Sequence, residues 1–487
     1  MTASRRRFSL IAAASLVLSA CAIPPKPTLP PLRDEAPLAG LPVPANGQWP
    51  EAEWWKRYAD PQLDDLETRA LADAPSLDEA HRRLETVIRS VQSARAAGGL
   101  GAQGNAQLQR QRLSENGLIP PRFLGFTWYN QADLNLQFQY DFDFFGKTRA
   151  AIEGAVDQAR AADAERSAAA LTLTAAVADA YFGWQADQAR LALARDSVDT
   201  LTRYRTLSAK RVERGVDAPD YLHQADERIA AVREAQAGYE GSAQLRLAAL
   251  AALLGTTPKA LPTLQARPLP AVDARLPDNV GIDLVARRPD VTAARWRVEA
   301  AMRQVDRARA EFYPDISLAG TIGLQSVDLD KLFNFDSRTL GIGPALHLPL
   351  FQRAQLKAAY GVSQAQLQAA ASQYDASVVD AAHDVATQAL NLTQAQARRK
   401  QRDAQIAAAE RLRTLAAARA RQGIADERTV LSAQSDILQQ RDAAASLDAQ
   451  AVSAQIALIK ALGGGYRSDA ADIASTPSTS SDRTESQ

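Results

Sequence analysis

Polar and apolar residues alternate with a period of two in four short segments of the chain. The clearest segment covers 133–144, where one face is apolar and the other carries Asp, Asn and Gln. The apolar face there consists of Leu134, Leu136, Phe138, Tyr140, Phe142 and Phe144. Such alternation is typical of a β-strand with two unlike faces. The pattern, weakest in the first segment, predicts strands over about 102–112, 128–145, 315–326 and 339–351.

These strands have the length of strands that cross a bilayer, roughly ten residues. The alternative is a soluble sandwich, in which other elements would cover the apolar face. We favour membrane strands, because the flanking helices are predicted to pack with each other and the polar face suits a water-filled lumen. Four strands cannot close a barrel, and open sheet edges are not tolerated in lipid. Several chains must therefore share one barrel.

Long helical hairpins are predicted beside the strands. Residues 147–213 contain no proline and little glycine, and an uninterrupted helix of that length would span about 100 Å. Narrow apolar seams suited to helix pairing follow in both halves of the chain. The turns Gly215–Pro219 and Gly423–Glu427 fold one helix back on the next. All helices then lie on one side of the membrane and the strand loops on the other.

The body also contains an internal duplication. Residues 214–229 match 422–437 at an offset of 208, and the strand segments upstream match at an offset of 206. This period is far longer than a solenoid repeat. We therefore divide the body into a first repeat, 51–279, and a second repeat, 280–467, each with helices, a strand pair and a helical hairpin.

The first 20 residues predict an export signal. Three arginines precede an apolar run that is far too short to span a membrane. Leu-Ser-Ala-Cys follows and resembles a bacterial lipobox, so we expect a covalent lipid, N-acyl and S-diacylglycerol, on Cys21. The alternative is an ordinary signal peptide with a chance cysteine, and the export route, Sec or twin-arginine, stays open. Ala22 in the next position, in place of Asp, indicates an outer-membrane address.

Two further segments are predicted to lie outside the folded body. Residues 21–50 are rich in proline, which favours an extended tether that cannot pack a core. Residues 468–487 are polar and rich in Ser and Thr, which predicts a disordered tail.

Composition narrows the classes of function. Lys and Arg together number 56, as do Asp and Glu, so the formal net charge is zero and a nucleic-acid partner is not expected. One cysteine and four histidines argue against most zinc sites. The GxGxxG at 99–104 lies between a predicted helix and a following strand, the reverse of the order in a dinucleotide site. We expect no enzyme activity, no metal and no cofactor besides the lipid.

Several motifs carry a resemblance to TolC-like outer-membrane factors of the lipoprotein branch, the NodT/OprM-type efflux proteins. They are YDFDFFGKTRA (140–150), DLVARRPDVTAARWRVEAA (283–301), ARAEFYPDISLAGTIG (308–323) and GPALHLPLFQRAQ (343–355). The resemblance covers about 50–465. It implies a mainly α fold with membrane β: a homotrimer whose four strands per chain form a twelve-stranded transmembrane β-barrel, with a long α-helical barrel in the periplasm.

The resemblance also implies function and partners. It describes the outer-membrane channel subunit of a tripartite efflux system that passively conducts small molecules and drugs to the exterior. The implied partners are a periplasmic membrane-fusion adaptor, an inner-membrane pump of the RND or MFS type, and outer-membrane lipid. Two alternatives remain: a type I protein-secretion exit duct with the same fold, and a non-channel periplasmic coiled-coil structural lipoprotein.

Candidate site residues follow from the same resemblance, which places adaptor docking at the helical tips. The tip residues are Arg214, Gly215, Asp217, Asp220, Gln422 and Gly423. Family tunnels close near these tips with rings of acidic residues, and we predict that Asp426 and Glu427 form such an aperture ring. Crowded carboxylates repel and raise one another's pKa. The alternative is that both are solvated charges at a helix start.

Overall fold

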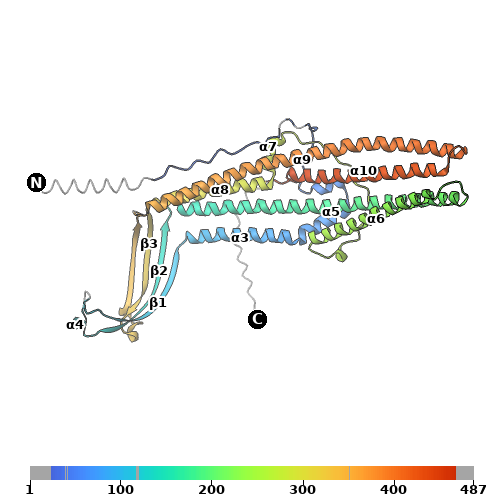
Figure 1. Ribbon diagram of the computed structural model, residues 1–487. Coiled ribbons are helices and arrows are strands. Elements are labelled where there is room, and N and C mark those ends of the chain that lie inside the picture. Colours follow the sequence, from blue (N-terminus) through green and yellow to red (C-terminus); the bar gives the residue numbers. More distant parts are fainter. Residues whose placement is uncertain (1–22, 39, 41, 117–119, 350, 468–487) are drawn as a thin grey trace.

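The chain forms a long helical body with a four-stranded sheet at one end and two helical tips at the other (Figure 1). The computed structural model describes residues 23–38, 40, 42–116, 120–349 and 351–467. Cys21, the export signal and the tail 468–487 lie outside the described residues. No helix within the described ranges is both long and apolar enough to cross a membrane.

The two halves of the chain have the same order of elements. The first half contains η1 (Trp54–Tyr58), α2 (Pro61–Asp73), α3 (Pro75–Ala97), β1 (Gly101–Arg112), α4 (Pro121–Leu124), β2 (Trp128–Phe142), α5 (Lys147–Glu213), α6 (Asp220–Leu253) and η2 (Pro258–Ala260). The second half contains α7 (Val280–Arg287), α8 (Pro289–Ala310), β3 (Asp315–Ser326), η3 (Leu329–Lys331), η4 (Phe335–Ser337), β4 (Arg338–His347), α9 (Arg353–Arg421) and α10 (Glu427–Ala461). Each half therefore supplies two strands and one long hairpin.

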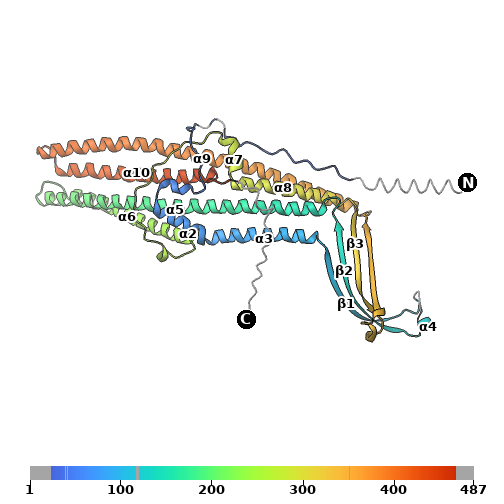
Figure 2. The same ribbon diagram turned by 180° about the vertical axis from the view of Figure 1, so that it is seen from behind.

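The sheet is antiparallel in the order β1-β2-β3-β4, so β1 and β4 are its edges. Its register aligns Ala106 with Leu134, Leu134 with Leu324, and Leu324 with Arg338. Even-numbered residues thus share one face, and its apolar side chains stay exposed: Leu134 is 41% exposed and Leu340 81%. None of the helices in the described residues covers this apolar face (Figures 1 and 2). The opposite face carries Gln, Asn and Asp.

Two strands end earlier than the sequence pattern suggested. β2 stops at Phe142 because the Asp143 carboxylate accepts hydrogen bonds from the backbone N–H groups of Thr148 and Arg149, at 3.0 and 2.7 Å. Asp143 therefore caps the first turn of α5, although the alternation continues through the sequence. β4 stops at His347, shortly before Pro349, which has no N–H to donate.

The core lies in the middle of the helical body, where the short helices pack on the long ones. One cluster of buried residues surrounds Tyr181 between α2, α5 and α6, and another surrounds Tyr374 between α8, α9 and α10. Arg288 of the RRPDV motif holds several elements together there. Its guanidinium donates to Asp290 at 2.7 Å, to Asp384 at 3.2 Å and to the carbonyl of Ala461 at 3.2 Å.

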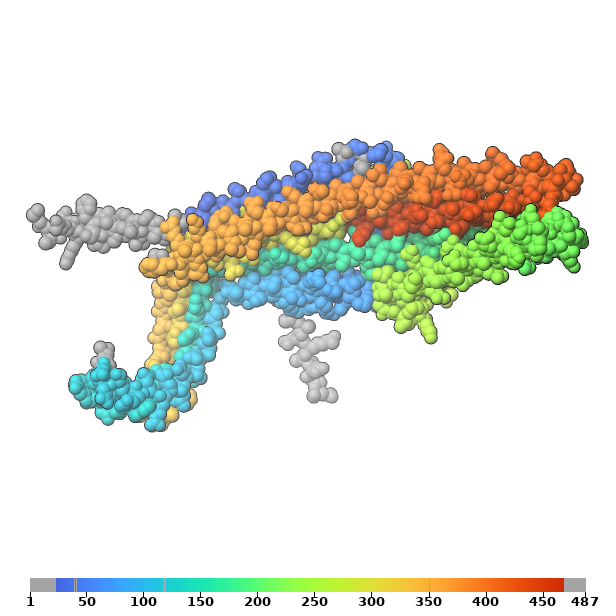
Figure 3. Space-filling view, viewed as in Figure 1, coloured from blue at the N-terminus to red at the C-terminus, as the bar shows by residue number. Residues whose placement is uncertain are grey.

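The proline-rich segment is not a free tether, and the expectation that it cannot pack a core was wrong. Its described residues between 23 and 50 run along α8 and α9 toward the sheet (Figures 1 and 3). We call this segment the strap. Its Ala36 is 1% exposed, and its N–H donates to the carbonyl of Gly281 at 2.8 Å. The Tyr374 hydroxyl donates to the carbonyl of Arg33 at 2.9 Å. An extended chain has free carbonyls, so side chains of neighbouring helices can bind it.

One carboxylate of the core has no compensating partner. Glu67 on α2 is 0% exposed, and neither of its carboxylate oxygens has a hydrogen-bond partner among the described residues. Burial, with a smaller contribution from the nearby charge of Asp64, raises the pKa of Glu67 to about 9. Glu67 is therefore neutral in the folded protein at pH 7 but ionised in the unfolded chain.

Replacing Glu67 should remove a pH-dependent loss of stability. Because its folded pKa is raised, wild-type stability is highest below the unfolded pKa near 4.3 and falls as pH rises toward 9, by up to about 1.4 kcal/mol per pH unit. Glu67→Gln cannot ionise, so its thermal midpoint should match the wild type near pH 3.5, below the unfolded pKa, and exceed it increasingly at about pH 5, 7 and 8.5. Glu79→Gln on α3, whose side chain is 72% exposed, is the control. Parallel midpoint curves for Glu67→Gln and wild type would contradict the assignment.

Candidate functional site

The two helical tips close with the same backbone geometry. α5 ends at Glu213, and Gly215 adopts a left-handed conformation with φ +69°; α9 ends at Arg421, and Gly423 does so with φ +73°. An L side chain is strained at such angles, which explains glycine at both turns. In each tip the next residue donates back to the helix: Val216 N–H to Arg211 and Ile424 N–H to Arg419, at 2.9 and 3.0 Å.

Four charged residues join the two tips, and we call them the tip cluster: Arg211, Asp217, Asp426 and Arg428. Arg211 binds Asp217 at 2.9 Å and reaches Asp426 of the other hairpin at 3.5 Å. Arg428 binds Asp426 at 2.9 Å and crosses to Asp217 at 2.6 Å. The cluster therefore alternates in charge, and each arginine bridges both hairpins.

The tip cluster holds its carboxylates in the ionised form. The hydrogen bond from Arg211, with the charge of Arg428, lowers the pKa of Asp217 below its usual value. Partial burial acts in the opposite direction on Asp426, but hydrogen bonds from Arg428 and the charge of Arg211 outweigh it and lower the pKa of Asp426. Asp217 and Arg428 are the most enclosed pair, with side chains 10% and 13% exposed. Pairs this enclosed are screened less by salt than surface pairs.

The predicted site residues take different positions in these tips. Arg214, Gly215, Asp220, Gln422 and Gly423 are exposed, while Asp217 lies inside the tip cluster. Asp426 is the N-cap of α10 and accepts from the N–H of Arg428 at 3.0 Å. Glu427 is exposed and has no charged partner in the described part of the chain. The structure thus separates the two acids of the predicted aperture ring, one engaged by arginines and one free.

Other tip residues escaped the sequence analysis. Arg211 and Arg428 were missed because each binds, besides the aspartate of its own tip, the aspartate of the other hairpin, which lies far away in sequence. Val216 and Ile424 are apolar yet 58% and 72% exposed, one on each tip. Each directly follows the glycine of its tip, so the 208-residue repeat offset would have paired them.

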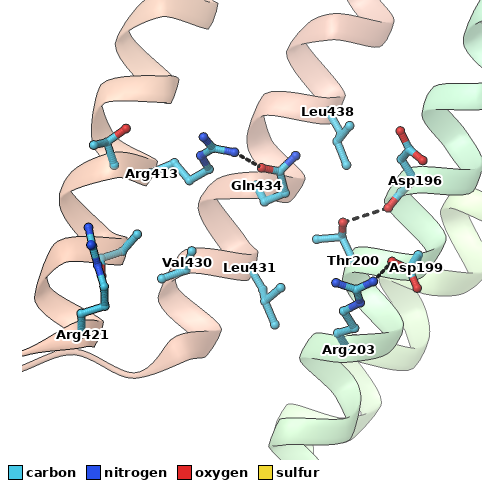
Figure 4. Close-up of a pocket in the computed structure, with 12 residues that line it drawn as sticks. Asp196, Asp199, Thr200, Arg203, Arg413, Arg421, Val430, Leu431, Gln434 and Leu438 are labelled. Carbon is cyan, nitrogen blue, oxygen red and sulfur yellow. Dashed lines mark hydrogen bonds and ion pairs between the residues drawn. The ribbon is translucent and has the colours of Figure 1, made fainter. Parts of the chain in front are cut away.

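Next to the tips, toward the middle of the helical body, a groove lies between α5 of one hairpin and α9 and α10 of the other (Figure 4). Its volume is about 610 Å³, and most of its lining is charged or polar. Arg203 pairs with Asp199 on α5 at 2.8 Å, and Arg413 on α9 donates to Gln434 on α10 at 2.9 Å. These charges are satisfied within one hairpin, so they do not close the groove.

A second polar link ties the hairpins farther from the tips. Arg190 on α5 binds Asp442 on α10 through two bonds, at 2.9 and 3.0 Å. The hydroxyl of Tyr239 on α6 donates to the same carboxylate at 3.1 Å. Three helices therefore meet at Asp442, and the groove lies between this link and the tip cluster.

The described residues offer no group of three or more His, Cys, Asp or Glu side chains that could hold a metal ion. The tip cluster alternates acid and base at contact distance, an arrangement that ties elements together. The ion pairs of the cluster therefore hold the two hairpins in position relative to each other.

Comparison with known proteins connects this architecture with a family. The model of the outer membrane efflux protein family matches residues 66–256 and 282–464, one segment in each half of the chain. The multidrug resistance outer membrane protein MdtP of Escherichia coli O6:H1 is 32% identical over 474 residues, covering 95% of this chain and 97% of that protein. MdtQ of Escherichia coli O157:H7 is 31% identical over 464 residues, covering 93% and 96%.

Solved structures show the same fold. The outer membrane protein VceC from Vibrio cholerae superposes with a TM-score of 0.77 at 34% identity, covering 86% of this chain and 100% of that chain. The outer-membrane channel OprN superposes with a TM-score of 0.81 at 25% identity, covering 91% and 99%. Both halves of this chain match the family model, and most of its length aligns with these relatives. The chain belongs to the outer membrane efflux protein family.

Proposed function

We propose that this protein is the outer-membrane channel subunit of a tripartite efflux system, which passively conducts small molecules from the periplasm to the exterior. One observation carries the proposal: a sheet with an exposed apolar face and two free edges continues directly into long, largely polar helical hairpins. The relatives are named multidrug resistance outer membrane proteins, which favours small-molecule efflux over protein secretion or a purely structural role.

Assembly follows from the edges of the sheet. β1 and β4 each have one neighbour in the chain, and unpaired backbone groups are costly in hydrocarbon. A homotrimer pairs β1 of one copy with β4 of the next and closes a twelve-stranded barrel. The apolar face then meets lipid, and the Gln-rich face of β1 lines the lumen. Neighbouring glutamines on that face already bond to each other, as Gln107 does to Gln109 at 3.1 Å.

The helical tips are the proposed docking surface for a periplasmic adaptor, which in turn contacts an inner-membrane pump of the RND or MFS type. Exposed Val216 and Ile424 offer apolar contacts on each tip, and Arg214, Asp220 and Gln422 surround them with polar groups. A trimer presents six tips, three of each kind. Glu427, exposed and unpaired, supports the aperture ring better than Asp426, which two arginines neutralise.

A covalent lipid on Cys21 is the proposed anchor. The strap brings the chain close to the membrane end of the body, because Arg309 near the end of α8 donates to the carbonyl of Pro24 at 3.0 Å. Tyr360 near the start of α9 donates to the carbonyl of Pro25 at 3.1 Å. Two residues separate Cys21 from Pro24, so the reach of the chain keeps Cys21 within about 10 Å of this point, beside the base of the sheet.

The oligomer tests the proposed function directly. The protein extracted from the outer-membrane fraction in mild detergent should have the mass of a trimer, measured by light scattering corrected for detergent. Planar bilayers containing this sample should show single-channel conductance, and a heat-dissociated sample should not. A monomer without conductance would rule out the shared barrel.

Substituting Cys21 tests the anchor. Cys21→Ser should yield a mature chain without the mass of the acyl and diacylglycerol groups, measured by intact-mass spectrometry. It should still reach its folded state, because the strap contacts begin at Pro24. An unchanged lipid mass in Cys21→Ser would contradict the assignment.

The tip cluster should set how far apart the hairpin tips lie. Arg428→Ala removes the nearest partner of Asp217 and leaves this carboxylate with Arg211 alone, so the contact between the two tips weakens. Amide hydrogen exchange should therefore quicken in residues 205–222 and 424–432, and single-channel conductance should rise as the tips separate. Arg419→Ala is the matched control, because this exposed arginine of α9 has no side-chain partner in the described residues. Equal exchange in both variants would show that the cluster does not hold the tips.

A further inference from the structure

The apolar face of the sheet ends in arginine at its loop end. β1 ends with Arg110 and Arg112, and β4 begins with Arg338. The register places all three on the even-numbered face, since Arg112 pairs with Trp128 and Arg338 pairs with Leu324. They therefore share the face that the proposed barrel presents to lipid, at the end farthest from the helices.

Each of these arginines lies at a site where a lipid headgroup could reach it. Arg110 stacks over the ring of Trp128 at 5.7 Å, and Arg338 stacks over Phe335. Trp128 is 53% exposed and Phe335 is 72% exposed. Neither Arg110 nor Arg338 has a carboxylate partner in the described residues. Arg112 has one, Glu115 at 3.5 Å, but both side chains are more than half exposed, so that pair is weak.

The other end of the same face has a different chemistry. Near the helices it carries Phe142, Phe144, Ile316 and Leu346, and no arginine in the described residues. Aromatic side chains are typical of both membrane interfaces, whereas the described arginines of this face all lie at its loop end. The acids described at the loop end lie outside the strands: Glu115 follows β1, and Asp328, Asp330 and Asp336 lie in the loop between β3 and β4. The asymmetry indicates an anionic partner in one leaflet only.

We propose that Arg110, Arg112 and Arg338 bind the phosphate groups of a phosphorylated glycolipid in the outer leaflet of the outer membrane. The planar guanidinium matches phosphate with two parallel hydrogen bonds, and the neighbouring rings hold the guanidinium groups at the interface. The helices extend into the periplasm, so the loop end of the sheet lies in the outer leaflet. This assignment rests on the proposed channel function.

Assembly strengthens the site. β1 and β4 are the two edges of the sheet, so the closed barrel sets Arg338 of one copy beside β1 of the next. Arginines from two copies then face the same lipid at each subunit boundary. A phosphorylated lipid bound there neutralises positive charges that would otherwise repel each other across the boundary.

Binding of defined lipids tests the site. Full-length protein in mild detergent is titrated with diphosphorylated lipid A, with enzymatically dephosphorylated lipid A and with phosphatidylglycerol, and binding is read by native mass spectrometry. Wild type should bind the diphosphorylated form at least about tenfold more tightly than the other two. The triple variant Arg110→Gln, Arg112→Gln and Arg338→Gln should lose this preference.

Control variants separate charge from position. Arg82→Gln, Arg83→Gln and Arg89→Gln on α3 remove the same charge far from the sheet and should bind as wild type. The triple Arg→Lys variant keeps the charge and should retain intermediate affinity, which also covers any folding defect of the Gln variant. Unchanged binding in the triple Gln variant, or equal binding of phosphatidylglycerol by wild type, would overturn the proposal. Conductance of the same samples reports on the channel separately.

Discussion

Pairing of backbone hydrogen-bonding groups at the edges of the sheet is the constraint on which the rest of the structure depends. Among the residues that the structure describes, β1 and β4 each lack a second neighbour, and no helix covers the exposed apolar face of the sheet. In water such a sheet would expose a large apolar surface, and in lipid it would leave a row of unpaired N–H and C=O groups. Both costs disappear only when copies of the chain join edge to edge. In the proposed homotrimer both costs are removed, and the helical hairpins are arranged by the same threefold symmetry.

The long helices pack against their neighbours through small residues, and their charged residues are spread along their length. α5 and α9 are each close to 70 residues long, and much of their buried surface is alanine. A helix that packs against neighbours on two sides has no single apolar stripe, and alanine allows close approach on each side. A few polar links between the hairpins, such as those at Asp442 and in the tip cluster, then fix the position of one hairpin along the other. These links are electrostatic, so they can separate without exposing a large apolar core.

Local pattern predicted most of the fold, and long-range contacts account for what it missed. Period-two alternation located four strands, and the glycines at 215 and 423 located both tips. The same alternation predicted too late an end for β2. Asp143 continues the polar face in the sequence, but its carboxylate caps α5. The strap was misjudged because its partners bind backbone carbonyls, which carry no side-chain signal. Arg211 and Arg428 were missed because the carboxylates that each bridges between the tips lie about 210 residues apart in sequence.

The height of the protein in the membrane follows from contacts at both ends of the sheet. At the helix end, Tyr360 and Arg309 hold the strap where it approaches Cys21, and Phe145 stacks on Tyr313 at 4.4 Å. At the loop end, arginines replace the apolar residues of the same face. A strand of ten residues tolerates little vertical displacement, since each step toward the helices moves Arg338 deeper into hydrocarbon, where lipid-facing arginine is increasingly destabilising. In the proposed channel, the lipid-facing arginines at one end and the lipid on Cys21 at the other therefore restrict displacement in opposite directions.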